Sequence, residues 1–187
     1  YPLRGAVTWK SIVGTNVASD ALANLASAGV KGGVLIVIGE DYGEGSSIIQ
    51  ERTHAYAMKS QVWLMDPRPH LPKIVEMAEA AFELSETSNT PVMLELRIRA
   101  CHVYGRFVAK DNRPGQYNAH HPLEQAVFDY NKVVLPPSSY QQEQLKITER
   151  WPEALRFIST NKLNQSLPGD CVDIGIIVQG GFYNALN

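Results

Sequence analysis

The residues whose types and spacing best suit chemistry form an acidic, glycine-rich stretch in the first third of the chain. Glycines alternate there with acids and two serines follow, in the order Gly39, Glu40, Asp41, Tyr42, Gly43, Glu44, Gly45, Ser46 and Ser47. Three carboxylates repel the phosphates of a cofactor, so this loop suits neutral ring atoms or the basic groups of a partner. The plain alternative is a strand-to-helix turn with solvated acids. The residues alone leave both interpretations open.

The segments on either side of this loop predict how it is positioned. Five consecutive apolar residues, 34–38, are typical of a strand buried on both faces of a sheet. Ser47 and Gln50 have the spacing of a capping box, which predicts a helix to about Lys59. This order directs a helix N-terminus at the carboxyl edge of a sheet, where open α/β folds bind ligands. The sequence therefore predicts where a site lies but not its ligand.

The rest of the chain alternates predicted strands and helices. A first helix over 12–28 has an apolar side that includes Val13, Val17 and Leu22, and Gly29 ends it. We further predict strands at 6–10, 62–65, 92–98 and 172–178, and helices at 72–88, 122–131, 140–163 (adjusted near 152) and from 182. This alternation indicates an α/β fold with a doubly wound, mainly parallel sheet and flanking helices.

Other candidate groups are isolated in the sequence. A histidine within a helix is more often a core or surface residue than a catalyst. The adjacent Cys–His pair has no identifiable acid to orient the histidine, as a nucleophilic site requires. Two histidines without further ligands do not make a metal site. The glycines at 175–181 lack the spacing of a dinucleotide loop. We therefore set aside Arg52 with His54, Cys101 with His102, and His120 with His121, and predict no metal site and no catalytic residue.

The composition excludes several classes of protein. The 187 residues are 44% hydrophobic and 19% charged, enough for a buried core, and a net charge of −2 gives no reason to expect nucleic acid or an anionic membrane as partner. No apolar run is long enough to span a membrane. Two cysteines cannot hold an iron–sulfur cluster, and a cytoplasmic location is the expectation.

Several stretches together resemble one family. The run GVKGGVLIVIGEDYGEGSS followed by QERTHAYAMKS is similar to the pyrimidine-binding domain of indolepyruvate ferredoxin oxidoreductases, which are thiamine diphosphate enzymes. The likeness begins at Val13 with a VG-x-N-x-A-x-D-x-L run, continues through 88–94 and reaches 175–184, with 105–135 the least similar. The resemblance implies that Gly14, Thr15 and Asn16 lie at the same sheet edge as the acidic loop. A plain N-terminal cap is the alternative for these three.

The resemblance also implies an activity and a cofactor site. Enzymes of this family decarboxylate aryl 2-oxo acids oxidatively, form an acyl coenzyme A and pass electrons to ferredoxin. Thiamine diphosphate with magnesium and iron–sulfur clusters belong to the intact enzyme, and tight binding of either to this chain alone is not expected. The residues expected to meet the aminopyrimidine ring are Gly14, Thr15, Asn16, Glu40, Asp41, Glu44, Gly45, Ser46 and Ser47.

The resemblance finally predicts what the chain lacks. The family's catalytic glutamate lies upstream of the motif at Val13, and none of the twelve preceding residues is Glu. We therefore expect an inactive fragment: the second half of the pyrimidine-binding domain (1–99), a connecting segment (100–168) and the start of a further α/β domain (169–187). The remaining domains or a partner subunit, and a second copy in a homodimer, are the expected partners. The alternatives are a small-ligand or nucleotide-binding module and a subunit-contact domain.

Overall fold

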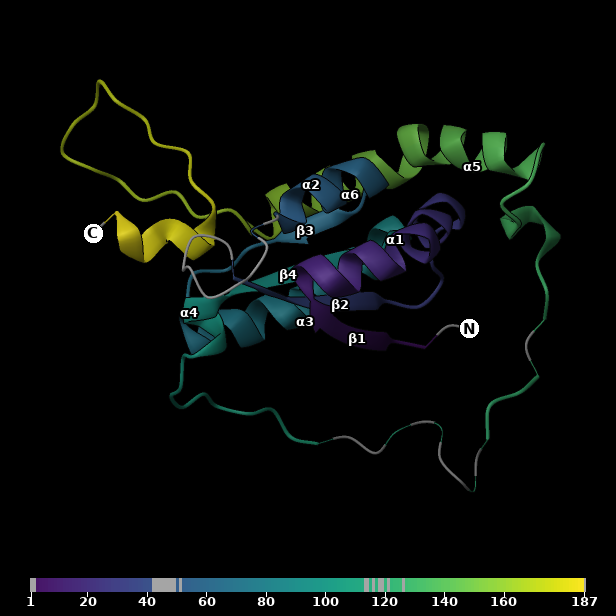
Figure 1. Ribbon diagram of the computed structural model, residues 1–187, viewed down its shortest axis with the longest axis horizontal. Helices are drawn as coiled ribbons and strands as arrows, with labels where there is room; N and C mark the ends of the chain where they lie inside the picture. The colour runs from purple at the N-terminus through teal and green to yellow at the C-terminus, as the bar shows by residue number, and fades with distance from the viewer. Residues whose placement is uncertain are drawn as a thin grey trace.

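The centre of the protein is a four-stranded parallel sheet. The computed structural model describes residues 3–41, 50, 52–112, 115, 117, 120, 122–125 and 127–186. All neighbouring strands pair parallel, in the order β1-β2-β4-β3 (Figure 1). The strands are β1 Gly5–Lys10, β2 Val34–Glu40, β3 Trp63–Met65 and β4 Val92–Arg97. The carboxyl ends of all four therefore meet at one edge.

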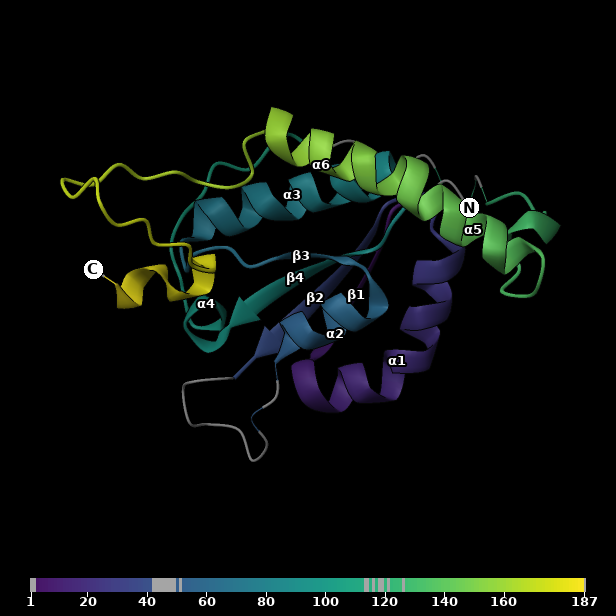
Figure 2. The ribbon, with the colours of Figure 1, turned by 90° about the horizontal axis from the view of Figure 1, so that it is seen from above.

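Helices cover both faces of this sheet. Helices α1 Ser11–Ala28 and α2 Thr53–Ser60 lie on one face, and α3 Leu71–Ser88 and α6 Trp151–Thr160 lie on the other (Figure 2). Two separate apolar clusters fill the layers, one between the sheet and α1 with α2 and one between the sheet and α3 with α6. The predicted α/β fold with flanking helices is confirmed.

Strand β2 shows why its sequence is apolar without alternation. Leu35 packs in the cluster with α3 and α6, whereas Ile36 and Ile38 pack in the cluster with α1 and α2. Side chains of successive strand residues point to opposite faces, and here both faces are covered. At about 25 cal/mol per Å² of apolar surface, burying such side chains is worth roughly 1.5–3 kcal/mol each. A central strand buried on both faces holds the start of the acidic stretch rigidly in place.

Helix α1 begins and ends close to its predicted bounds. It ends at Gly29, which has φ +74°, and a Cβ there would lie 2.7 Å from the carbonyl oxygen of Asn89. Both facts favour glycine. The predicted apolar side is wrong for the first half of the helix, because the side chains of Val13 and Val17 are exposed. Leu22 and Ala26 are buried, so the apolar face is confined to the half that packs on the sheet.

Helix α2 begins later than its capping-box spacing predicts. Gln50 lies outside the helix, which starts at Thr53, and Ser47 is outside the residues that the structure describes. The physical reason lies in the sheet: the carboxylate of Glu40 accepts hydrogen bonds from the backbone N–H and the hydroxyl of Thr53, at 2.8 and 2.6 Å. An acid from a strand therefore stabilises the helix N-terminus in place of a local cap.

The following elements agree with the sequence. Pro72 stands in the first turn of α3, and β3 and β4 lie within a residue of their predicted positions. The short helix α4 Ile98–Cys101 follows β4 directly. The predicted helix over 140–163 is observed as α5 Ser138–Leu145, a π-helical turn Lys146–Arg150 and α6. The predicted adjustment near 152 is therefore this π-turn, which buries Lys146 and Arg150.

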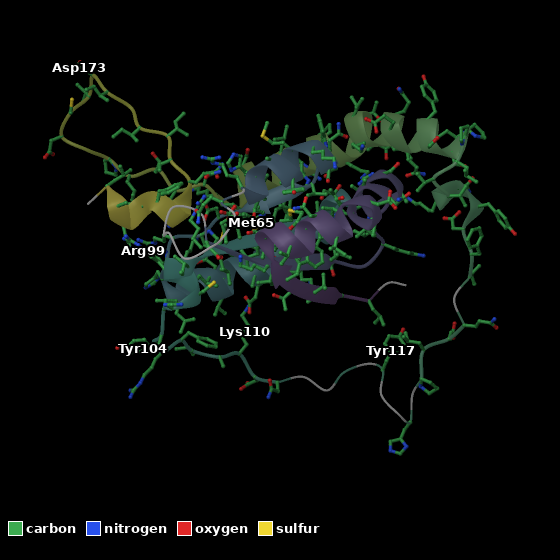
Figure 3. All side chains as sticks on the ribbon, in the orientation of Figure 1. Met65, Arg99, Tyr104, Lys110, Tyr117 and Asp173 are labelled. Atoms are coloured by element: carbon green, nitrogen blue, oxygen red, sulfur yellow. The ribbon has the colours of Figure 1, made fainter. Side chains whose placement is uncertain are left out.

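The connections and the C-terminal segment differ most from the elements predicted from the sequence. The described residues of 122–129 are not helical, and only a 3-10 turn, Tyr130–Lys132, follows. Residues 172–178 form no strand: no strand of the described chain pairs with them, and a strand needs a neighbour for its backbone hydrogen bonds. A 3-10 helix, Gly180–Ala185, stands where a helix was predicted. Figure 3 shows Tyr104, Tyr117 and Asp173 on the two extended segments, away from the sheet.

Candidate functional site

Glu40 is the last residue of β2, not a loop residue as its glycine neighbour suggested. Its side chain is 2% exposed. Oε1 accepts a hydrogen bond from the Ser11 hydroxyl at the start of α1, at 3.3 Å, and Oε2 accepts the two hydrogen bonds from Thr53. Hydrogen bonds to a charged group are stronger than neutral ones. The carboxylate therefore joins β2, α1 and α2 at the carboxyl edge of the sheet.

Strand β4 adds two charged side chains on the same face of the sheet. In the parallel register Ile38 lies opposite Glu95, and Glu40 lies opposite Arg97. Glu95 is 1% exposed and Arg97 is 6% exposed. Charged groups this deeply buried are rare unless paired, so the ends of β2 and β4 form a charged cluster above an apolar core.

Arg97 is the centre of this cluster. Its Nε and Nη2 donate to Oδ2 of Asp66, just after β3, at 3.0 and 2.8 Å, and Nη2 lies 3.1 Å from Oε1 of Glu95. Nη2 also donates to Oε1 of Gln179 at 2.7 Å, and the guanidinium lies 4.1 Å from the ring centre of Phe182. One arginine thus connects two strands of the sheet with the C-terminal segment.

The C-terminal segment closes the edge beside α4 (Figure 1). The backbone N–H of Gly181 donates to Oδ1 of Asp66 at 3.1 Å, and Arg68 lies over the ring of Tyr183. Between this segment and the sheet is a cavity of about 200 Å³, lined by Glu40, Arg52, His54, Glu95, Arg97, Gln179 and Phe182. The cavity lies where open α/β folds bind ligands.

The buried acids of this cluster hold protons more tightly than exposed acids do. Burial raises the pKa of Glu95 to about 8, with the charge of Asp66 adding to the rise and Arg97 opposing it. Burial also raises the pKa of Asp66, although its hydrogen bonds with Arg97 act in the opposite direction. Perturbed carboxyls beside a cavity are a feature of functional sites. Glu95 is therefore a neutral, protonated acid over much of the physiological pH range.

The structure gives packing roles to two of the predicted site residues. Gly14 and Thr15 lie inside α1, so they do not cap it. A Cβ on Gly14 would lie 2.5 Å from the Trp9 side chain, and the fully buried hydroxyl of Thr15 accepts from Trp9 Nε1 at 2.9 Å. These contacts fix α1 against β1. Any contact of either residue with a cofactor stays a prediction.

Asn16 and Asp41 lie nearer the surface. The Asn16 side-chain oxygen accepts a hydrogen bond from the hydroxyl of Tyr56, which links α1 with α2, and Asp41 forms an ion pair with Lys10 at 3.0 Å. Glu44, Gly45, Ser46 and Ser47 lie outside the described residues. The structure therefore brings Glu40 into the cavity wall, places Asn16 and Asp41 on neighbouring elements, and does not test the rest of the predicted loop.

Two of the residues set aside from the sequence reappear here, since Arg52 and His54 both line the cavity. Cys101 remains an unconvincing nucleophile, because burial raises the pKa of its thiol and the thiol contacts the carbonyl oxygen of Leu96 at 3.2 Å. Within the described part of the chain no group of three or more His, Cys, Asp or Glu residues is arranged to hold a metal ion.

Asp66, Glu95 and Arg97 were not predicted from the sequence as site residues. The signal was present in Met93-Leu94-Glu95-Leu96-Arg97, where two charges alternate with apolar residues in a strand predicted to be buried. Alternation places both charges on one face, and buried charges need partners. Asp66, which follows the neighbouring strand, is that partner. Gln179 and Phe182 carried no such signal, because their segment reaches the sheet through tertiary contacts alone.

The chain is similar along almost its whole length to subunits of an oxidoreductase. It is 31% identical over 180 residues, 95% of the chain, to the indolepyruvate oxidoreductase subunit IorA of Methanothermobacter marburgensis, and 27% identical over 180 residues to that of Methanothermobacter thermautotrophicus. Over 104 residues it is 36% identical to the IorA subunit of Thermococcus kodakarensis. These similarities confirm the resemblance to indolepyruvate oxidoreductases.

The match covers a limited part of those relatives. The chain spans 28% of the length of the two Methanothermobacter subunits and matches 16% of the Thermococcus subunit. No protein-family model and no solved structure matches the sequence. Among the described residues no helix is both long and apolar enough to cross a membrane.

Proposed function

We propose that this chain, a homologue of the IorA subunits, forms part of the pyrimidine-binding region of a thiamine diphosphate-dependent indolepyruvate oxidoreductase. The similarity over 95% of the chain carries the proposal. The reaction is the oxidative decarboxylation of an aryl 2-oxo acid to an acyl coenzyme A with ferredoxin as electron acceptor. The partner subunit or further domains supply the diphosphate site and the iron–sulfur clusters, and the chain by itself is inactive.

The residues at the carboxyl edge fit the ring end of the cofactor. Hydrogen-bonding side chains of α1, α2 and β2 meet there, namely Ser11, Thr53 and Glu40, and the Phe182 ring adds an apolar wall. Polar atoms with an aromatic wall suit a planar nitrogen heterocycle. When bound, thiamine diphosphate supplies the carbanion chemistry of decarboxylation. In this proposal the chain's own residues bind and orient the ring and exclude water from it.

Glu40 acts in this proposal as a positioning residue. Its oxygens accept hydrogen bonds from the first residues of both helices, which holds α1 and α2 in a fixed relation. Small displacements of groups at a reacting centre are costly in rate, so a rigid junction matters there. Asn16, Asp41 and the loop residues Glu44, Gly45, Ser46 and Ser47 are proposed to meet the ring or the substrate.

A homodimer is also part of the proposal. Strand β1 is an edge strand whose residues are mostly exposed, and Val7 at its centre is 45% exposed. An unprotected edge can pair with another chain. Light scattering of the purified protein over a range of concentrations is expected to give twice the mass of one chain, and a monomer at every concentration contradicts this part.

An activity measurement on the assembled enzyme tests the function. Ferredoxin reduction with indolepyruvate is expected to require coenzyme A and thiamine diphosphate, and absence of reduction with every aryl 2-oxo acid contradicts the proposal. Asn16→Ala is expected to lower turnover roughly tenfold or more, with little change in Tm. Asn24→Ala is the matched control, because Asn24 is exposed on the same helix and donates a hydrogen bond to the carbonyl oxygen of Asp20, one turn earlier in that helix. Equal turnover of both variants contradicts the assignment of Asn16.

A further inference from the structure

One buried carboxyl oxygen beside the cavity has no hydrogen-bond partner among the described residues. Glu95 is 1% exposed, and its Oε1 lies 3.1 Å from Arg97 Nη2, whereas Oε2 is buried and unpaired in the part of the chain that the structure describes. Most buried polar side-chain atoms in proteins are paired, and an unpaired one calls for an explanation. Glu95 lines the cavity, so a ligand in the cavity can supply the partner.

The size of the cavity limits its ligand to about one ring. The volume is about 200 Å³. A cavity of about 150 Å³ is large enough to hold benzene, whereas sites for drug-sized ligands and cofactors occupy about 300–1,000 Å³. The ring of Phe182 forms part of the wall, and aromatic side chains pack well against other flat rings. The cavity therefore fits a single aromatic ring with a small substituent.

The buried charges around the cavity already have partners within the chain. Arg97 donates two hydrogen bonds to Asp66 and lies close to Glu95, so its positive charge faces two acids. The carboxylate of Glu40 accepts hydrogen bonds from α1 and α2. A charged ligand of either sign would have to displace one of these contacts, because a buried charge without a partner is costly. The cluster therefore favours a neutral ligand.

The remaining two titratable residues of the lining do not change this balance. Arg52 is exposed and also has an interaction within the chain, so its charge is not reserved for a ligand. His54 presents an imidazole, which in its neutral form carries one donor and one acceptor nitrogen and so suits an uncharged polar group. Neither residue calls for a charged ligand.

The unpaired oxygen selects the polar group of the ligand. A protonated carboxyl donates from Oε2 of Glu95, and an ionised carboxyl accepts there. A hydroxyl group can both donate and accept, so it pairs with Oε2 in either state, whereas an ether oxygen only accepts and a ring N–H only donates. A hydroxyl group is therefore the complement that does not depend on the protonation of Glu95.

We propose that the cavity at the carboxyl ends of β2 and β4 binds a neutral aromatic ring that carries a hydroxyl group, with the hydroxyl group hydrogen-bonded to Oε2 of Glu95. The inference rests on the proposed function for the source of the ring, which is the aryl group of the 2-oxo acid. Glu95 is then the residue that selects a hydroxylated ring. A ring without the hydroxyl group leaves the buried oxygen unpaired, and sites of this kind discriminate against such an analogue.

Calorimetry on the purified protein tests the hydroxyl group. The probes are 4-methylphenol, which is neutral at pH 7 as the phenol of tyrosine is, and toluene, which differs from it only by the hydroxyl group. We expect 4-methylphenol to bind roughly tenfold or more tightly than toluene. Equal affinity for the two probes overturns the proposal. Absence of binding by both also overturns it, because water is then the partner of Glu95.

Two charged probes of similar size test the preference for a neutral ring. Benzoate carries a negative charge at pH 7, and benzylamine carries a positive charge. Because the buried charges of the lining are already paired, we expect each to bind at least tenfold more weakly than 4-methylphenol. Binding of benzoate as tight as that of 4-methylphenol identifies an anion site, and equally tight binding of benzylamine identifies a cation site. Either result overturns the proposal.

Two substitutions at Glu95 assign the hydroxyl preference to this residue. Glu95→Leu removes both oxygens at similar size, so 4-methylphenol and toluene are expected to bind it within about twofold of each other, and binding of toluene shows that the cavity is intact. Glu95→Gln retains a donor and an acceptor and is expected to keep the preference within about threefold. Glu79→Leu, at an exposed acid on α3, is the control and should behave as the wild type. A preference that survives in Glu95→Leu, or is lost in Glu95→Gln, overturns the role of Glu95.

The outcome is distinguishable from that of the activity measurement. A protein that prefers 4-methylphenol to toluene, but whose assembled enzyme reduces no ferredoxin, supports the ring site and contradicts the oxidoreductase proposal. In an active enzyme, the KM of the 4-hydroxyphenyl 2-oxo acid is expected to be lower than that of its phenyl analogue, and the difference should disappear in Glu95→Leu. A KM ratio that is the same in the wild type and in Glu95→Leu overturns the ring site alone.

Discussion

Two arginines at opposite ends of the sheet show how the same residue type serves different purposes. Arg97 lies at the carboxyl ends of the strands and contacts two acids, a glutamine and an aromatic ring. Arg150 lies in the π-turn on the other side of the molecule and donates to the carbonyl oxygens of Ala26 and Ser27 and to the Thr90 hydroxyl. Both are about 5% exposed.

The partners explain the difference between these two arginines. The carbonyl oxygens that Arg150 contacts lie in the last turn of α1, where a positive charge is favourable and the backbone lacks its own donors. Burial lowers the pKa of Arg150, and its hydrogen bonds to α1 and α3 go to neutral carbonyl oxygens, so it is a structural residue that joins α1, α3 and the π-turn. Arg97 instead faces acids beside a cavity, and one oxygen of Glu95 has no hydrogen-bond partner among the described residues. A buried arginine is therefore a candidate functional residue when its neighbours are acids, and a structural residue when its neighbours are backbone carbonyl groups.

The largest effect is expected from removal of the positive charge at Arg97. Arg97→Met leaves Asp66 and Glu95 buried without their cation, which typically costs about 3–5 kcal/mol. The cost is greatest at high pH, where both acids are ionised, and shrinks as pH falls and they take up protons. Denaturant unfolding at several pH values measures it. Arg99→Met, at an exposed neighbour, is the control and should change stability by less than about 0.5 kcal/mol.

A smaller effect that does not depend on pH is expected for Arg150. Arg150→Met leaves several buried carbonyl oxygens without donors, at a cost of about 3 kcal/mol. Because none of those partners titrates, the loss should be the same at every pH at which the wild type is folded. Arg156→Met, at an exposed arginine of α6, is the matched control. A loss that grows with pH, as for Arg97, contradicts the distinction between the two arginines.

Local sequence patterns predicted some parts of the fold and not others. Strands 34–40 and 92–97 were predictable because burial on two faces requires continuous apolar residues, and α3 because proline and periodicity mark it. Residues 172–178 are as apolar as a strand, yet no strand of the described chain pairs with them, so the strand predicted from their composition does not form. Strand formation depends on a partner, which a local pattern does not contain.

The candidate site was predictable in place but not in content. The edge of the sheet and Glu40 followed from the order of strand, loop and helix. Glu95 and Arg97 were missed because the strand that carries them was interpreted only as apolar core. Gln179 and Phe182 enter the cavity wall from a segment more than eighty residues further along the chain. A contact at that separation follows from tertiary packing, not from spacing.

The smallest effect is a gain in stability from Glu95→Gln at high pH. The folded-state pKa of Glu95, about 8, lies above the value of 4.5 that the unfolded chain has, so folding favours the protonated form. Its contribution to stability is therefore full below about pH 4.5, declines as pH rises towards 8, and above 8 the ionised carboxyl is a net cost. Glutamine has no charge to bury. At pH 9 the variant should be more stable than the wild type by about 2 kcal/mol.

Unfolding measured at pH 5 and at pH 9 checks this expectation. At pH 5 the two proteins should differ little, because Glu95 is protonated in the folded state, and the difference should appear progressively as pH rises. Glu86→Gln should have the opposite effect on stability. The hydrogen bond with Arg4 lowers the pKa of the Glu86 carboxyl, so this carboxylate stabilises the folded protein at pH values above its unfolded-state pKa. Removing it should therefore destabilise the protein slightly at neutral and high pH. If Glu95→Gln destabilises the protein at pH 9 as well, the carboxylate is already stabilised by groups around it. The carboxyl edge is then a structural ion cluster of the same kind as the Arg150 junction, and the contrast between the two ends of the sheet is lost.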